Sequence, residues 1–303
     1  MGQRVSPGPV PLGVAFAVAA LGIGLFSIMD GVMKGLVLAL GVYNVMLWRS
    51  MGNVLLGAGA WAAVGYRRPT RRALTLHLAR GAVTCAMALL FFWGLARVPM
   101  AQAIALSYIA PLLALILSAW LLKEHVSRRA IGAALAATLG IATIFVGQSR
   151  TALGPAAFAG ALAILASAVL YAGNLILTRL QSLAARPAET ACLQSVVILA
   201  LLGCAAPWLA VVPPLAALPS LALAAGLAFT SMMLLSWAYG HGEAGYLAMT
   251  EYSSFVYAAV LGYLLFGERV SSYTLIGAVV IVAACVYAAR RRDIAAHSLE
   301  QAA

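Results

Sequence analysis

Long apolar runs are the feature that most constrains how this chain folds. They are each about 20 residues long, carry almost no charge and are separated by short polar segments. Apolar residues make up 64% of the 303 positions and charged residues only 9%, whereas a water-soluble domain has about half and about a quarter. Because the runs lack a sustained polar and apolar alternation, they predict membrane-spanning helices rather than a β-barrel.

Ten such runs follow one another, which predicts an all-α membrane protein with ten transmembrane helices. Residues 1–11 and 290–303 are expected to be polar tails. Residues 148–155 should link two halves of five helices each, 12–147 and 156–289. The first run should be a signal anchor rather than a cleaved peptide, because further spans follow it. The helices are expected at about 12–33, 42–64, 74–96, 101–122, 128–146, 156–177, 189–211, 220–239, 248–268 and 272–289.

The net charge of +11 reflects basic residues gathered in short loops. An even number of spans puts both termini on one side. Placing them in the cytoplasm leaves thirteen Lys and Arg residues inside and four outside, as the positive-inside rule requires. The expected location is therefore the inner cell membrane, in contact with lipid. A nucleic-acid partner is not expected, because the basic segments are short and lack interleaved aromatic residues.

The two halves match each other at an offset of about 144 residues. Five helices is an odd number, so the second half enters the membrane from the opposite face and the repeat is inverted. Inverted repeats are typical of secondary transporters, whose site lies where the repeats meet near the membrane centre. The matches in one register include Trp93 with Trp237, Tyr108 with Tyr252, Leu117 with Leu261, Glu124 with Glu268 and Ser127 with Ser271.

The doubled helix ends carry a resemblance to a known family. With Pro111 and the downstream Ile-Gly-Ala segments, they make the chain similar to the drug/metabolite transporter superfamily, in particular its EamA-type ten-helix carriers. The resemblance implies movement of small metabolites through a central cavity by alternating access. A narrower likeness, carried by Glu251 and Tyr252, is to carriers of the S-adenosylmethionine-uptake type. The helix ends in question are Lys123-Glu-His-Val-Ser127 and Gly267-Glu-Arg-Val-Ser271.

The sequence departs from a regular repeat at two places. Phe255 stands where the first half has Pro111, and Lys123 precedes the first glutamate where the second half has Gly267. These motifs specify fold and superfamily, and they do not specify the substrate.

Glu251 is the leading candidate for a functional charge. It lies about a turn into an otherwise apolar run, and its counterpart in the first half is Ser107. A carboxylate inside a membrane helix is costly and is usually kept for a function. Glu251 suits proton binding or pairing with a cationic group of a substrate. The structural alternative is a salt bridge with Arg80.

Arg49 is the second intramembrane charge we single out. It lies about two turns into its helix and could contact a carboxylate or phosphate of a substrate. The structural alternative is pairing with Asp30. Asp30 is itself a site candidate, although it stands four residues before Lys34 and an interfacial pair of those two is favoured. The opposite signs of Glu251 and Arg49 are compatible with a zwitterionic or cationic substrate.

Uncharged polar and aromatic residues complete the candidate site. Asn174 matches Asp30 in the repeat and is expected to line the same cavity. The aromatic candidates could stack on a planar substrate, although aromatic residues in membrane helices more often pack or anchor the interface. They are Tyr108, Tyr252, Trp93 and Trp237.

Several classes of site find no support in the sequence. The four cysteines lie in apolar runs without metal-ligand spacing, and there is no phosphate-binding loop or nucleophile elbow. We therefore expect no metal, no cofactor and no catalytic residue. Glu124 and Glu268 are expected to stabilise the next helix start. The leading function is secondary transport of a small organic metabolite, with proton coupling as one option. A membrane-embedded enzyme and a structural or assembly subunit are the alternatives.

Overall fold

The computed structural model describes residues 12–65, 68–121, 128–150, 154–182, 184–239, 241 and 249–300, and all regular structure in these ranges is helical. The helices group into ten spans, because α4 with α5 and η2 with α11 each form one. The elements are α1 (Leu12–Leu40), α2 (Val42–Ala63), α3 (Arg71–Leu95), α4 (Met100–Ser107), α5 (Ala110–Leu121), α6 (Arg128–Arg150), α7 (Gly154–Ser182), α8 (Pro187–Leu209), η1 (Leu215–Ala217), α9 (Leu218–Tyr239), η2 (Met249–Tyr252), α11 (Ser253–Phe266) and α12 (Ser272–Glu300).

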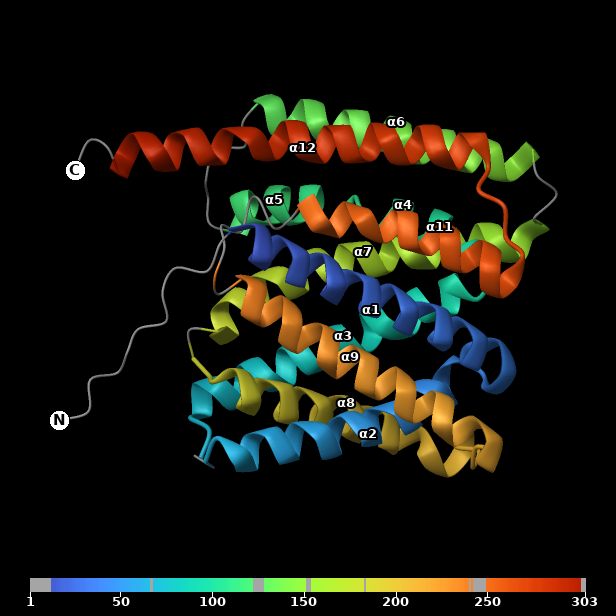
Figure 1. The fold of residues 1–303 in the computed structure, drawn as a ribbon, viewed down its shortest axis with the longest axis vertical. Helices are drawn as coiled ribbons and strands as arrows, with labels where there is room; N and C mark the ends of the chain where they lie inside the picture. The colour runs from blue at the N-terminus through green and yellow to red at the C-terminus, as the bar shows by residue number, and fades with distance from the viewer. Residues whose placement is uncertain are drawn as a thin grey trace.

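The helices run roughly parallel or antiparallel to one another across the molecule (Figure 1). Helix α1 begins and helix α12 ends at the same side of the bundle, which we call the terminal face. The other side is the opposite face. Five helices are long and apolar enough to cross a membrane by length and composition, and shorter apolar helices accompany them in the described ranges. The fold is an all-α membrane protein, as the sequence predicts.

The packing of the helices follows the inverted repeat. The pair α3 and α7 is matched by its symmetry mate α9 and α1, and both pairs pack closely along their length. Helices α2 and α8 pack against each other at one edge of the bundle, and α6 and α12 at the other (Figure 1). Each of these edge pairs joins equivalent helices of the two repeats. The two halves are thus interleaved rather than side by side.

Two glycines bring α6 and α12 together. A Cβ at Gly277 would lie 2.6 Å from the backbone oxygen of Gly140, and one at Gly140 would lie 2.8 Å from that of Gly277. Small residues allow close helix approach in membranes, where no water is left to drive association. Gly132, which is also on α6, faces open space instead, with nothing within 4 Å of an added Cβ.

Two spans are broken at matching positions. In the first half, α4 ends at Ser107 and α5 begins at Ala110. Pro111 accounts for this break, because it lacks an N–H for the helix ladder and disfavours helical backbone in the preceding residue. In the second half, the 3₁₀ turn η2 ends at Tyr252 and α11 begins at Ser253. The sequence predicts an unbroken helix at both places, and this expectation is wrong.

Some helix ends also differ from the prediction. Helix α1 continues to Leu40, where Gly41 with φ 78° turns the chain directly into α2. Left-handed backbone of this kind favours glycine. Helix α12 continues to Glu300, because 290–300 contains neither Gly nor Pro. Helix α6 reaches Arg150 and α7 begins at Gly154, so the predicted link is shorter. The predicted N-terminal tail, 1–11, lies outside the described residues.

Candidate functional site

The two broken spans meet at equivalent tyrosines. The rings of Tyr108 and Tyr252 are edge to face, with centroids 5.4 Å apart. The hydroxyl of Tyr108 accepts the backbone N–H of Phe255 at 2.9 Å and lies 2.8 Å from the Ser254 hydroxyl. A side chain of the first repeat therefore satisfies a backbone donor at the start of α11, which would otherwise lack a partner in a membrane. The site is organised around this crossing.

Glu251 lies next to the crossing, in η2, and is exposed. Tyr171 of α7 is 37% exposed and lies within electrostatic range of both Glu251 and Arg80. Arg80, on α3, is buried. Glu251 and Arg80, which come from different repeats, thus both act electrostatically on Tyr171. This is the half of the molecule nearer the terminal face.

Arg80 directs its guanidinium to neutral amides rather than to Glu251. Its Nε donates to Asn174 Oδ1 at 3.1 Å, and its Nη1 donates to Gln181 Oε1. Its Nη2 makes no hydrogen bond to any residue in the described ranges. The salt bridge between Glu251 and Arg80, considered as the structural alternative, is not formed within 4.0 Å in the described part of the chain. The guanidinium of Arg80 therefore keeps its Nη2 group available to bind an anion.

A buried chain of polar side chains continues from Arg80 to the terminal face. Gln181 Nε2 lies 2.5 Å from His77 Nδ1, and His77 Nε2 lies 3.1 Å from Glu189 Oε1. All of these residues are buried and come from α3, α7 and α8. Because buried polar groups are costly unless hydrogen-bonded, the network holds Arg80 in one orientation.

Asn174 also connects to the neighbouring polar side chains. Its Oδ1 accepts the hydroxyl of Thr84 at 3.1 Å, and Gln194 Nε2 donates to Thr84 Oγ1 at 3.0 Å. The hydroxyl of Thr84 therefore bridges two amides from α7 and α8. The structure thus brings Asn174 together with Arg80. We call the hydrogen-bonded residues that connect to Arg80 the polar cluster: His77, Arg80, Thr84, Asn174, Gln181, Glu189 and Gln194.

Asp30 and Arg49 lie on α1 and α2, in the half of the molecule nearer the opposite face. They are within electrostatic range of each other but form no ion pair within 4.0 Å. Asp30 is 3% exposed. In the described part of the chain, Asp30 Oδ1 and Arg49 Nε are buried without a hydrogen-bond partner. The expected structural pairing of the two is therefore incomplete.

The other contacts of Arg49 are with two thioether sulfurs and an aromatic ring. Its Nη1 lies 3.6 Å from Met29 Sδ, its Nη2 lies 3.7 Å from Met46 Sδ, and its guanidinium carbon is 5.5 Å from the centre of the Phe92 ring. Thioethers are weak acceptors, and an aromatic face is a weak partner for a cation. Arg49 therefore retains hydrogen-bonding capacity.

Lys34 does not pair with Asp30, which corrects the interfacial pair expected from their spacing. Lys34 Nζ forms a salt bridge with Glu268 and donates to Val98 O at 2.7 Å. Glu268 Oε2 also accepts the backbone N–H of Met100 at 2.8 Å. Glu268 thus ties α1, the start of α4 and the end of α11 together. The start of α12 is capped instead by Ser271, whose Oγ accepts the N–H of Thr274.

A comparison with known families decides the class of the protein. The sequence profile of the EamA-like transporter family matches residues 12–146 and 158–290, one match for each repeat. The chain belongs to the EamA-like transporter family.

Relatives and a solved structure agree with this assignment. The transporter is 26% identical over 270 residues to the pseudopaline exporter CntI of two strains of Pseudomonas aeruginosa, which covers 88% of this chain and 93% of that protein. A solved structure titled only as a crystal structure of a protein matches with a TM-score of 0.61 at 21% identity, covering 92% of this chain and 98% of the other. That likeness supports the fold. The protein is therefore a multi-pass membrane transporter and not an enzyme.

The two tryptophan candidates lie away from the broken helices of the transporter. The guanidinium of Arg97 stacks on Trp93, 3.6 Å from the ring centre, and donates to Trp93 O at 2.8 Å. Trp237 is 39% exposed and stacks on His241 with centroids 4.5 Å apart. Trp93 is thus near the opposite face and Trp237 near the terminal face. Neither is joined to the polar cluster around Arg80.

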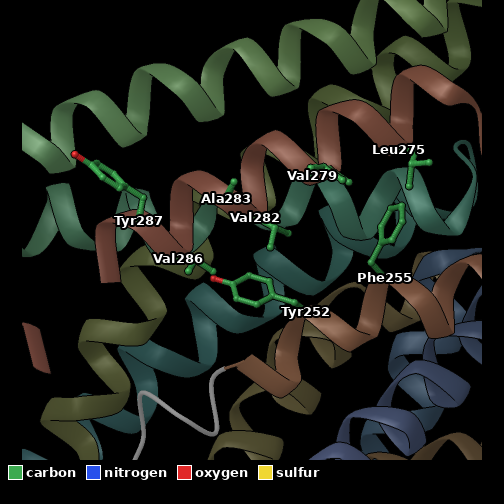
Figure 2. Close-up of a pocket in the computed structure, with 9 residues that line it drawn as sticks. Tyr252, Phe255, Leu275, Val279, Val282, Ala283, Val286 and Tyr287 are labelled. Atoms are coloured by element: carbon green, nitrogen blue, oxygen red, sulfur yellow. The ribbon is translucent and has the colours of Figure 1, made fainter. Parts of the chain in front are cut away.

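An apolar cavity of about 530 Å³ lies between α11 and α12. Figure 2 shows Tyr252 and Phe255 on one wall, facing residues of α12 such as Val282. Tyr252 therefore borders this cavity as well as the contact with Tyr108. Because almost all of its lining is aliphatic or aromatic, the cavity suits an apolar moiety better than a charged one.

Several residues in and beside the transporter's polar cluster were not predicted from the sequence. Each is a single polar residue in an apolar run, so only its position in an otherwise uncharged helix could have signalled it. No group of three or more His, Cys, Asp or Glu side chains that could hold a metal occurs in the searched ranges. Glu124 lies outside the described residues. The missed residues are His77, Thr84, Tyr171, Gln181, Glu189 and Gln194.

Proposed function

We propose that this EamA-like transporter is a secondary active carrier that exports small organic solutes bearing both an ammonium and a carboxylate group. The observation that supports this most directly is the position of Tyr171, within range of Glu251 and Arg80. Glu251 would bind the ammonium group and the free edge of Arg80 the carboxylate, with the solute lying along the aromatic ring. Charge-assisted hydrogen bonds of this kind are the strong ones in a low-dielectric site.

Alternating access is the mechanism that the inverted repeat favours. Two interrupted helices, one from each repeat, cross at Tyr108 and Tyr252, and interrupted helices at the repeat interface form the sites of many carriers. Rocking of one repeat against the other about this crossing would expose the Glu251 side first to one face and then to the other. The likeness to exporters supports efflux as the direction.

A proton gradient is the proposed energy source. The sequence contains no phosphate-binding loop, which argues against nucleotide hydrolysis. The carboxylates Asp30, Glu189 and Glu251 lie within spans, where proton relays use acidic side chains. We further propose that both termini are cytoplasmic, because the basic starts of α3 and α6 and the basic C-terminal part of α12 lie toward the terminal face (Figure 1).

Transport into proteoliposomes tests the proposal. Three radiolabelled probes separate the charge classes: histidine carries both groups, lactate only a carboxylate, and putrescine only ammonium groups. Histidine is expected to enter faster than either, and faster than into liposomes without protein. A result in which no probe moves, or only a singly charged class moves, contradicts the proposal.

Two substitutions test whether Glu251 and Arg80 bind the charged groups of the solute. Glu251→Gln and Arg80→Gln should each lower the apparent affinity for histidine by about 10- to 100-fold, the equivalent of losing a charge-assisted hydrogen bond of about 1.5–3 kcal/mol. Glu300→Gln is the matched control, because it removes a carboxylate at the last residue of α12. An unchanged affinity in Glu251→Gln would remove this residue from the site.

A further inference from the structure

We propose that Asp30 binds and releases the proton that drives transport, with Arg49 as its charge partner. This inference rests on the proposed proton-driven function and assigns a residue to it. Asp30 combines two properties in the structure: its side chain is 3% exposed, and its Oδ1 has no hydrogen-bond partner in the described part of the chain. A buried carboxylate oxygen without a partner is a place where a proton can be added without breaking a bond.

The position of Arg49 gives Asp30 two alternative states. Arg49 is within electrostatic range of Asp30, yet its Nε also lacks a partner and its Nη atoms rest on Met29 and Met46. An ionised Asp30 is drawn toward the guanidinium, and a neutral Asp30 is not. The weak thioether contacts let Arg49 leave them at little cost. Adding or removing one proton therefore changes the attraction between α1 and α2.

The matching place in the other repeat holds uncharged residues. Asn174 matches Asp30, and Leu193 matches Arg49. Asn174 Oδ1 accepts hydrogen bonds from Arg80 Nε and from the hydroxyl of Thr84. Thr84 lies in the first repeat, and its match in the second repeat, Ala228, has no hydroxyl. The Asn174 side is thus hydrogen-bonded. The Asp30 side is charged and lacks this hydroxyl.

The charged groups around Asp30 leave Arg49 as its partner. On α1 itself, Lys34 is engaged by Glu268. On α3, Arg80 is engaged by Asn174 and Gln181. Helix α9 carries no acidic or basic residue. The remaining titratable groups of elements packed on α1 are Tyr43, Arg71, Arg72, His77, Cys85, Tyr239, Glu251, Tyr252, Tyr257 and Tyr263.

Proton binding at Asp30 changes how strongly α1 and α2 attract each other. With a proton on Oδ1, the carboxyl is neutral, Arg49 loses its electrostatic partner, and α1 and α2 are less strongly held together in the half near the opposite face. Release of the proton restores the attraction. Only a proton moves in this step, and no bond other than its O–H bond forms or breaks. The two arrangements form the bistable element that a coupled carrier needs.

Infrared difference spectroscopy tests the proposal without a substrate. The full-length transporter is reconstituted in proteoliposomes, and spectra are compared between alkaline and acidic buffer. Wild-type protein should gain a carbonyl band of a neutral carboxylic acid on acidification, and the band should shift in D₂O. Asp30→Asn should lose this band. The controls Glu189→Gln and Glu251→Gln, which remove other carboxylates of the spans, should retain it.

Each outcome decides the proposal. Persistence of the full band in Asp30→Asn overturns it, as does loss of the same band in Glu251→Gln. Elution as a single species in size-exclusion chromatography shows that the variant is folded. If Asp30→Asn does not fold, Asp30→Glu decides instead. Its longer side chain should move the midpoint pH of the band, and an unchanged band and midpoint contradict the proposal.

A transport measurement ties the proton to flux. With radiolabelled histidine as probe, a pH gradient should accelerate wild-type transport, while Asp30→Asn should transport at the same rate with and without the gradient. Exchange of labelled for unlabelled histidine at equal pH should survive in Asp30→Asn. Acceleration of Asp30→Asn by the gradient overturns the assignment. Failure of wild type to move histidine contradicts the proposed function and leaves the infrared result as the separate test of Asp30.

Discussion

Tyr108 and Tyr252 occupy equivalent positions in the two repeats and contact each other edge to face, with ring centroids 5.4 Å apart. The contact is not symmetric, however. The Tyr108 hydroxyl binds the backbone at the start of α11, whereas the residue that matches Phe255 in the first repeat is Pro111, which has no N–H to offer. One repeat therefore interrupts its helix with a proline, and the other relies on its partner's hydroxyl.

Tyr108→Phe should weaken this crossing. The substitution leaves the N–H of Phe255 without its acceptor, and we expect a loss of about 1–2 kcal/mol, the range of interhelical hydrogen bonds in membranes. Thermal unfolding in detergent measures the effect. Tyr263→Phe is the matched control, because Tyr263 lies on α11, the helix of Phe255, and is 60% exposed. Equal unfolding temperatures for both variants would show that the hydroxyl of Tyr108 is dispensable.

Lys34→Met should destabilise the protein more than removal of both partners. Lys34 and Glu268 are a largely buried ion pair, and loss of one partner leaves the other charge uncompensated, at a cost of about 3–5 kcal/mol. The double variant Lys34→Met, Glu268→Met should recover much of this loss. A double-mutant cycle on unfolding temperature provides the measurement. Additive effects of the two single substitutions would argue against direct coupling.

Gly277→Ala should disrupt the contact between α6 and α12. The added methyl group would lie 2.6 Å from the Gly140 oxygen, so the helices must separate. Gly132→Ala is the control on α6, where an added Cβ meets nothing, and it should stabilise by up to about 1 kcal/mol through helix propensity. Cysteine cross-linking between the two helices reports their separation. An unaltered cross-linking rate in Gly277→Ala would contradict the prediction.

Gln181→Leu should disconnect the two ends of the polar network. His77 Nδ1 and Arg80 Nη1 each lose their partner, and each unsatisfied buried group costs about 1–3 kcal/mol. We expect a lower unfolding temperature and weaker histidine binding, because Arg80 is no longer held in one orientation. Isothermal titration with histidine checks the second effect. Unfolding and binding identical to wild type would mean that Gln181 does not position Arg80.

Much of the fold was predictable because a helix that spans a membrane requires a run of about 20 apolar residues, which is visible in the sequence. The matched tyrosines also predicted that the helices containing Tyr108 and Tyr252 are symmetry mates. The break after Ser107 was not predicted, although Pro111 was visible, because proline is tolerated in membrane helices and marks a break only in context.

The pairing of charges was less predictable than the spans. Spacing of four residues favoured Asp30 with Lys34, yet the partner of Lys34 is Glu268, 234 positions away. Local spacing says which side chains share a helix face, and it does not say which helix comes next to that face. The same limit applies to Arg80, whose partners Asn174 and Gln181 lie in the other repeat.

The Lys34–Glu268 pair makes the two faces of the molecule unequal. The residue that matches Lys34 in the second repeat is Thr178, which has no charge and bonds only its own helix through Asn174 O. The Lys34–Glu268 ion pair thus lies near the opposite face, and the equivalent ion pair cannot form near the terminal face because Thr178 is uncharged. The ion pair therefore stabilises the contact between α1 and the end of α11 at the opposite face, and Thr178 cannot supply the matching ion pair at the terminal face.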